Sequence, residues 1–134
     1  MTKAEPINPP ALFPDAGYHY AMVAPAGRVV YTAGACPLDA NGEVVGPDDL
    51  EVQARVALDN LARTLAEAGS GLDQVLKTTV FVVARDRSDL TRVWKVVADR
   101  FSTARPPSTL LGVSVLGYRN QRVEIEAVAL ATPP

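Results

Sequence analysis

The chain has 134 residues, a formal net charge of −2 and 48% hydrophobic residues. This length is typical of one domain with its own hydrophobic core, and the ordinary share of apolar residues excludes a disordered chain. A mildly acidic chain without a run of basic residues is poorly suited to nucleic acid, so we expect no such partner. No apolar stretch reaches the length of a membrane span, and the N-terminus lacks the apolar segment of a signal peptide. We therefore expect a cytoplasmic protein that does not bind membranes.

The cysteine and histidine content limits the chemistry further. Cys36 is the only cysteine and His19 the only histidine. A single cysteine forms no intrachain disulfide, and a zinc site needs several cysteine or histidine ligands. We expect no metal site on this chain alone.

The first elements in chain order are short. Prolines are frequent in residues 1–16, which predicts an irregular arm in front of a single domain over residues 17–131. Residues 18–24 and 28–33 are candidate strands, and Pro25-Ala26-Gly27 between them predicts a hairpin turn.

A first amphipathic helix follows. Asp48 and Glu51 have the spacing of a capping box at its start, and Gly69 predicts its end. The polar face offers Glu51/Arg55 and Asp59/Arg63 pairs four residues apart. Apolar residues recur with a period of 3.6 and define a buried face: Leu50, Ala54, Ala57, Leu58, Leu61, Leu65 and Ala68.

A second helix is expected to begin at the Ser88-Asp89 pair and to end before Pro106 and Pro107. Trp94 lies on its apolar stripe, so this side chain either fills the core or forms the wall of a pocket. The full stripe consists of Leu90, Val93, Trp94, Val97 and Phe101.

Three further strands complete the pattern. Residues 75–83 are almost wholly β-branched or aromatic, and residues 108–115 and 123–130 form two more strands with a hairpin over 116–121. The element order β-β-α-β-α-β-β predicts an α+β domain.

The sheet has more apolar surface than two helices can cover. In residues 75–83 both alternating sets are apolar, with Leu76, Val80 and Val82 on one side and Val75, Phe81 and Val83 on the other. A sheet with one face in water should instead alternate apolar and polar residues. Because the second face would expose a larger apolar patch than monomers tolerate, we expect it to be buried between subunits.

The last strand supplies the strongest catalytic candidate. A period of two places Arg122, Glu124 and Glu126 on one face and Val123 and Ile125 on the core face. A carboxylate in a cleft at the subunit interface can transfer protons. The alternative is that these are rim charges, salt-bridged to Arg122 or another neighbour.

His19 and Cys36 have plainer alternatives as well. His19 is a candidate general base, but it has no acidic partner at strand or helix spacing, which favours a structural role. Cys36 has neither a base nor a helix N-terminus beside it in the sequence, which favours a small buried residue over a nucleophile.

Three segments together resemble the reactive intermediate deaminase (Rid) family, also called the endoribonuclease L-PSP family. Residues 32–39, Thr-Ala-Gly-Ala-Cys-Pro-Leu-Asp, are similar to the family's Thr-Ser-Gly-Gln-x-Pro-Leu-Asp segment. Residues 76–82 and 123–127 match later family segments in the same order. The resemblance covers residues 17–131.

The resemblance implies a chorismate-mutase-like fold, in which a mixed but mostly antiparallel sheet carries two helices on one face, and a homotrimer with ligand clefts between subunits. It also implies hydrolysis of enamine or imine intermediates to ammonia and a 2-keto acid, without a cofactor or metal.

The resemblance assigns roles to residues of this chain. Glu124 matches the family glutamate that positions or activates water, Tyr18 matches the pocket tyrosine, and Gly34 matches a backbone position in the cleft. Together with Tyr18 and Gly34, the expected substrate-binding residues are Ala33, Cys36, Trp94, Ser108, Thr109 and Arg122.

The chain also departs from the family pattern. Ala33 and Ala35 replace a serine and a glutamine. Ser108 or Thr109 stands where deaminating members carry an arginine whose guanidinium holds the substrate carboxylate. Arg105 and Arg122 are the alternative anchors for such an anion.

Two functions are compatible with these residues. The first is hydrolysis of an enamine, imine or related intermediate whose acid group is absent or held elsewhere. The second is a trimeric protein that binds a metabolite without turning it over. A third function, ribonuclease activity, is credited to some members of the family, but the acidic composition argues against it.

Overall fold

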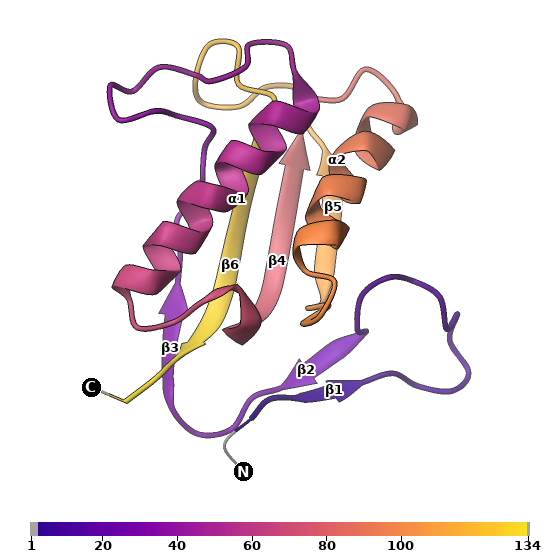
Figure 1. Cartoon of the computed structure of the whole chain (residues 1–134). Coiled ribbons are helices and arrows are strands. Elements are labelled where there is room, and N and C mark those ends of the chain that lie inside the picture. Colours follow the sequence, from indigo (N-terminus) through magenta and orange to yellow (C-terminus); the bar gives the residue numbers. More distant parts are fainter. Residues whose placement is uncertain (1–2, 134) are drawn as a thin grey trace.

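The computed structural model describes residues 3–133 (Figure 1). Its elements in chain order are β1 (Glu5–Ile7), β2 (Ala21–Val23), β3 (Arg28–Tyr31), α1 (Leu50–Glu67), the 3-10 turn η1 (Leu72–Gln74), β4 (Val75–Val82), α2 (Arg87–Arg100), β5 (Ser108–Gly112) and β6 (Val123–Ala131).

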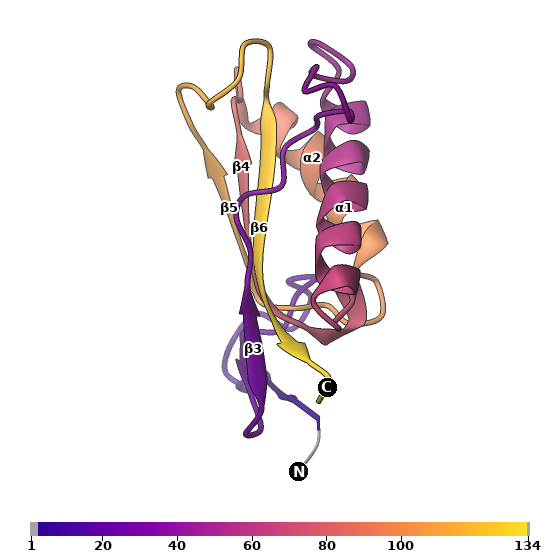
Figure 2. The same cartoon turned by 90° about the vertical axis from the view of Figure 1, so that its left-hand side faces the viewer.

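The main sheet has four strands in the order β3-β6-β4-β5. Strand β6 pairs antiparallel with both β3 and β4, whereas β4 and β5 run parallel. Both helices lie on the same side of this sheet, and Figure 2 shows the other side without a covering layer. The predicted α+β class and the mixed, mostly antiparallel sheet are confirmed.

The core lies between the helices and the sheet. Leu61 of α1, Val80 of β4 and Ile125 of β6 have no solvent exposure. The predicted apolar stripe of α1 is buried from Leu50 to Leu65 because a period of 3.6 keeps these side chains on one face. In α2, Trp94 packs against the edge of this core and is only partly buried.

The helix starts differ slightly from those expected. Asp49 caps α1 by accepting a hydrogen bond from the Val52 amide, and Asp86 caps α2 through the amides of Ser88 and Asp89. Asp48 has a left-handed backbone (φ 62°), so it cannot itself be the extended N-cap residue.

The ion pairs of α1 run to α2 instead of along α1. Glu51 pairs with Arg92, and Asp59 pairs with Arg100. The pairs expected within α1 are therefore replaced, because α2 brings its arginines alongside the acidic side chains of α1.

The hairpin expected between residues 18–24 and 28–33 is wrong. Strand β2 pairs with β1, which lies in the segment predicted to be irregular, and β3 pairs with β6. Proline and glycine at 25–27 do make a turn, but the two flanking strands enter different sheets. Local turn chemistry does not determine which distant strand each one meets.

The hairpin expected over residues 116–121 is also wrong. Strand β5 lies beside β4, and β6 lies on the other side of β4. The β4-α2-β5 segment forms a parallel crossover, which requires a helical connection of this length. Residues 116–121 therefore link two strands that do not touch.

The sheet face away from the helices, which we call the open face, carries large apolar side chains. Tyr31 is 77% exposed, Leu111 42% and Val29 40%. This agrees with the predicted excess of apolar surface, while the subunit interface itself stays a prediction. No helix within residues 3–133 combines the length and apolarity needed to cross a membrane.

Candidate functional site

Glu124 is fixed on β6 by two donors. The Cys36 Sγ donates a hydrogen bond to Glu124 Oε1 at 3.0 Å, and Gln121 Nε2 donates to the same oxygen at 3.2 Å. Both bonds fall on one carboxylate oxygen, so Oε2 accepts no hydrogen bond from the residues that the structure describes. One oxygen is thus used to hold the side chain, and the other is free for chemistry.

Gly34 lies directly against this carboxylate. A Cβ atom at Gly34 would be 2.5 Å from Glu124 Oε2, which no ordinary contact allows. Backbone hydrogen bonds in both directions between Ala35 and Ile125 hold this segment across β6. Gly34 is therefore needed for close approach. The structure thus brings Gly34, Cys36 and Glu124 together, and Ala33, Gly34 and Cys36 also line a cavity of about 560 Å³ beside α1.

Cys36 is a donor and not a nucleophile at neutral pH. Burial and the hydrogen bond to Glu124 raise the pKa of the Cys36 thiol to about 11. A thiol with this pKa stays protonated at pH 7, whereas a reactive cysteine needs its thiolate. A structural role for Cys36 is thus favoured over a nucleophilic one, and its thiol also holds Glu124 in place.

Gln121 is a functional candidate that the sequence analysis missed. It is 4% exposed, and its Oε1 accepts a hydrogen bond from the Tyr118 amide at 3.1 Å. Its Nε2 also donates to the Val123 carbonyl at 3.1 Å. We interpreted this position only as part of a turn. An amide side chain three residues before a pocket carboxylate was the signal that could have identified it.

A second group of predicted residues meets elsewhere on the protomer. Tyr18, Ser108 and Thr109 line a cavity of about 420 Å³ together with Lys77. The Tyr18 ring stands edge-on to Trp94, with ring centroids 6.0 Å apart. Trp94 thus packs against the Tyr18 ring. It does not itself line this cavity, in contrast to the expected substrate-binding role.

Ser108 and Thr109 face different sides of the sheet. Thr78, which is 1% exposed, donates a hydrogen bond from Oγ1 to Ser108 Oγ at 2.7 Å. Lys77 Nζ donates to Thr109 Oγ1 at 2.6 Å. Ser108 therefore points its hydroxyl toward the helix side, and Thr109 presents its hydroxyl on the open face.

The expectation that Arg122 shares a face with Glu124 is wrong. The Arg122 guanidinium pairs with Asp89 at 2.9 Å and Asp48 at 3.2 Å, and its Nε donates to the Val83 carbonyl. The Arg85 amide and Arg122 both donate to Asp89 and hold the pKa of that carboxyl below its usual range. Arg122 lies before β6, which begins at Val123, so the alternation of side chains along the strand does not apply to it.

Arg105 and His19 belong to the docking of the N-terminal arm. The His19 amide donates to the Arg105 carbonyl, and Asn8 Nδ2 donates to His19 Nδ1 at 2.9 Å. Burial and the charge of Arg105 lower the pKa of His19, so the ring is neutral at pH 7. Arg105 lines a smaller cavity with these residues, which adjoins the cavity of Lys77 and Thr109 because both are lined by His19.

The two groups of candidate residues lie at different levels along the main sheet. Glu124 is opposite Phe81, whereas Lys77 is opposite Val128. Four residues along a strand separate Glu124 from Val128 by roughly 13 Å. In a single chain the Glu124 carboxylate and the Lys77 cavity therefore occupy separate places along the sheet.

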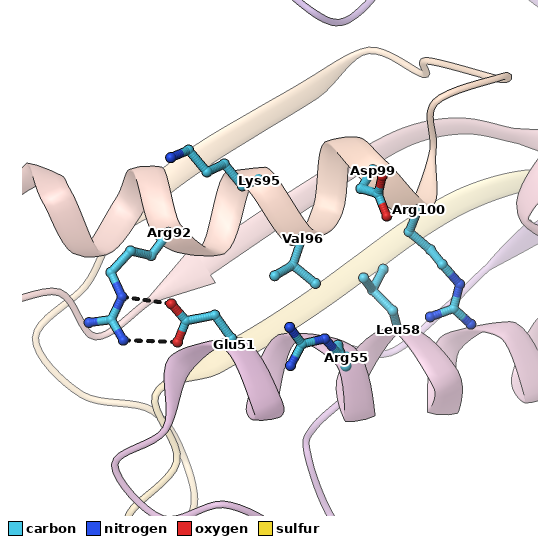
Figure 3. A pocket seen from close by; sticks show the side chains of 8 residues that line it. All are labelled: Glu51, Arg55, Leu58, Arg92, Lys95, Val96, Asp99 and Arg100. Atoms are coloured by element: carbon cyan, nitrogen blue, oxygen red, sulfur yellow. Dashed lines mark hydrogen bonds and ion pairs between the residues drawn. The ribbon is translucent and has the colours of Figure 1, made fainter.

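A further groove does not contain these residues. It has a volume of about 580 Å³ and lies between α1 and α2, where Arg92 is bound by both oxygens of Glu51 (Figure 3). Two ion pairs cross between the helices, Glu51 with Arg92 and Asp59 with Arg100, and the groove is lined by four cationic and two acidic side chains. Within residues 3–133 there is also no group of three or more potential metal ligands.

Comparison with known proteins places the chain in a family. The family described as endoribonuclease L-PSP matches residues 10–131. Protein mmf1, mitochondrial, of Schizosaccharomyces pombe is 33% identical over 132 residues, covering 97% of this chain and 78% of that protein. The 2-iminobutanoate/2-iminopropanoate deaminase of Mus musculus is 32% identical over 114 residues, covering 85% and 82% of the two chains.

A solved structure gives the same result for the fold. The crystal structure of YyfB from Yersinia pestis, a protein of unknown function of the conserved Rid family, superposes with a TM-score of 0.89 at 30% identity, covering 97% of this chain and 99% of that one. The chain belongs to the Rid family and has its chorismate-mutase-like fold.

Proposed function

We propose that the protein is a homotrimer that hydrolyses an enamine or imine in a cleft between subunits. The observation that carries this proposal is the Glu124 carboxylate, which is held by Cys36 and Gln121 through one oxygen and leaves the other unbonded within the described chain. The name of the mouse relative, a 2-iminobutanoate/2-iminopropanoate deaminase, supports the reaction class.

The arrangement suits hydrolysis because one carboxylate oxygen can accept a proton from water. Water adds its oxygen to the imine carbon while Glu124 Oε2 takes a water proton. That proton passes to the nitrogen and gives a carbinolamine. Glu124 Oε2 then takes the proton of the carbinolamine hydroxyl and gives it to the nitrogen, so that the carbonyl forms as the carbon–nitrogen bond breaks and ammonia leaves. The sum is one imine and one water giving one ketone and one ammonia, so no cofactor is needed.

The separation of the two residue groups supports a cleft shared by two subunits. Glu124 with Gly34 would come from one protomer, and the cavity with Tyr18, Lys77 and Thr109 from the next. The exposed Tyr31 and Leu111 side chains supply apolar surface for such an interface. A closed ring of three protomers would then contain three equivalent sites.

A binding protein without turnover is the second candidate. The observation that favours it is the loss of polar groups that the family resemblance leads one to expect. Ala33 and Ala35 replace a serine and a glutamine, and Ser108 or Thr109 stands in place of an arginine. Such a protein would keep the cleft and its ligand but would not accelerate hydrolysis.

The experiment that separates the two candidates is an ammonia-release assay. The purified protein is mixed with 2-iminopropanoate or 2-iminobutanoate generated in situ, and with an imine that lacks a carboxylate. We expect release faster than in buffer for at least one substrate, and a loss of about 100-fold or more in Glu124→Gln. Glu126→Gln is the matched control, because Glu126 lies two residues along the same strand.

No acceleration with any imine would contradict hydrolysis, and ligand binding that persists would then support the binding protein. RNA cleavage is not part of the proposal, given the acidic composition of the chain. Salt-sensitive binding of RNA by the purified protein would contradict that choice.

A further inference from the structure

Lys77 is a half-buried ammonium group without a counter-ion on the open face. It lies on β4 opposite Val128 and lines the cavity of about 420 Å³ that also contains Tyr18 and Thr109. No aspartate or glutamate lines this cavity. Lys77 forms no ion pair with any residue between 3 and 133. Fully buried ammonium groups are almost always paired, whereas Lys77 is partly buried and has no acidic partner in the described chain.

The electrostatic environment of Lys77 consists of burial alone. Burial lowers the pKa of the Lys77 ammonium, and no neighbouring charge acts on it appreciably. The carboxylate nearest in register, Glu126, lies opposite Thr79 and is not ion-paired with Lys77. No opposite charge within the described protomer therefore offsets the energetic cost of burying this cation. An anion bound in the cavity would offset it.

Lys77 and Thr109 each have a hydrogen-bond donor that is free for such an anion. Lys77 Nζ donates to Thr109 Oγ1 at 2.6 Å and to the Thr78 carbonyl at 3.3 Å. An ammonium has three N–H groups, so one is unused. The Thr109 hydroxyl accepts from Lys77, which leaves its own hydrogen available for donation. The Lys77 ammonium on β4 and the Thr109 hydroxyl on β5 thus provide two donors that lie side by side in one cavity.

We propose that Lys77, with the Thr109 hydroxyl as a second donor, anchors the carboxylate of the small-molecule ligand. The identity of the ligand as a carboxylate rests on the proposed function, whereas the presence of an anion subsite rests on the cavity itself. Arg122 is excluded from this role because it is bound to Asp89 and Asp48. Arg105 lines an adjoining cavity that shares Tyr18, His19 and Tyr20 with this one, but it does not line the cavity that contains Lys77 and Thr109.

The chemistry of lysine defines what the subsite selects. A guanidinium holds a carboxylate through two parallel hydrogen bonds, whereas an ammonium is a point charge on a flexible stem. Lys77 should therefore bind the anion without fixing its plane. We expect the protein to accept carboxylates whose carbon skeletons differ more widely than a bidentate arginine would allow.

The test is ligand binding, measured by calorimetry or by nuclear magnetic resonance titration. The probe is 2-oxobutanoate, the keto acid that hydrolysis of 2-iminobutanoate gives, and the neutral control is butanone. We expect the wild-type protein to bind 2-oxobutanoate and to bind butanone far more weakly. Lys77→Met should weaken binding about ten- to a hundredfold. Lys77→Arg should restore most of it.

Lys95→Met is the matched control, because Lys95 is an exposed lysine in the groove between the helices. It should leave the dissociation constant unchanged. Equal binding by wild type and a folded Lys77→Met, equal affinity for butanone, or no binding by wild type would each overturn the proposal. If Lys77→Met does not fold, equal 2-oxobutanoate affinity in Lys77→Ala or Lys77→Gln would overturn it instead.

The proposed hydrolysis and this subsite fail in different ways. If hydrolysis is wrong but the subsite is right, 2-oxobutanoate binds, Lys77→Met weakens it, and no imine is turned over. If the subsite is wrong but hydrolysis is right, Glu124→Gln abolishes turnover while Lys77→Met changes neither binding nor turnover of 2-iminobutanoate.

Discussion

The two faces of the main sheet differ in how completely their side chains are satisfied. On the helix face, Ile125 and Val80 have no exposure, and the Arg122 guanidinium is matched by two carboxylates. On the open face, Glu124 has an unused oxygen and Lys77 lacks a counter-ion within the described chain. The helix face therefore accounts for the stability of the protomer. The open face offers unpaired polar groups and exposed apolar side chains to a second subunit and a ligand.

The largest expected effect is on the helix face. Ile125→Ala removes a fully buried side chain and should lower the free energy of unfolding by about 2–5 kcal/mol. Leu111→Ala on the open face should change the unfolding of a dilute, dissociated protomer by less than about 1 kcal/mol. Urea unfolding of both variants measures the difference. Equal destabilisation would contradict the division between the two faces.

The next prediction concerns the buried ion pair on the helix side. Arg122→Met leaves Asp89 without its buried partner and should cost about 3 kcal/mol in unfolding free energy. Arg105→Met, which removes an exposed arginine, should change it by less than about 0.5 kcal/mol. A folded, stable Arg122→Met with impaired ligand binding would show that Arg122 belongs to the site after all.

A single methyl group tests the open face. Gly34→Ala places a Cβ 2.5 Å from Glu124 Oε2 and must displace the carboxylate. Because misplacement of a catalytic group by about 1 Å can cost roughly 100-fold, we expect turnover to fall by about that factor. Gly27→Ala is the control, since a Cβ there meets nothing within 4 Å. Unchanged turnover in a folded Gly34→Ala would remove Glu124 from the mechanism.

The smallest effect is on the titration of Cys36. The thiol should titrate near pH 11 because burial and Glu124 both disfavour the thiolate. Glu124→Gln removes a negative charge, so the pKa of Cys36 should fall, while burial keeps it above its usual value. Thiolate absorbance as a function of pH measures both values. An identical titration in the variant would mean that the thiol and the carboxylate do not interact.

The sequence was sufficient for the helices because their signal is local. A period of 3.6 and the breaks at Gly69 and Pro106 define α1 and α2 within a few residues. Strand pairing is not local. Nothing in residues 25–27 or 116–121 indicates that β2 joins β1 or that β6 lies beyond β4. These partners depend on tertiary packing, and turn residues predicted the wrong ones.

Parity along the strands explains what was found and missed in the site. Glu124 was placed on the correct face because β6 is regular from Val123 onward. An irregularity between Val75 and Lys77 interrupts the alternation at the start of β4, so Val75 is buried together with Val80. No sequence pattern announces this bulge, and the position of Lys77 beside Thr109 could not be predicted without it.

The central claim is that Glu124 of one protomer acts with the Tyr18 cavity of another. Glu124→Gln and Tyr18→Ala should each be inactive. If the two chains are unfolded together in equal amounts and refolded, random assembly gives about a quarter of the shared sites both intact groups. We predict recovery of about a quarter of wild-type turnover. A mixture that stays inactive, or a Tyr18→Ala protein with full activity, would contradict the account.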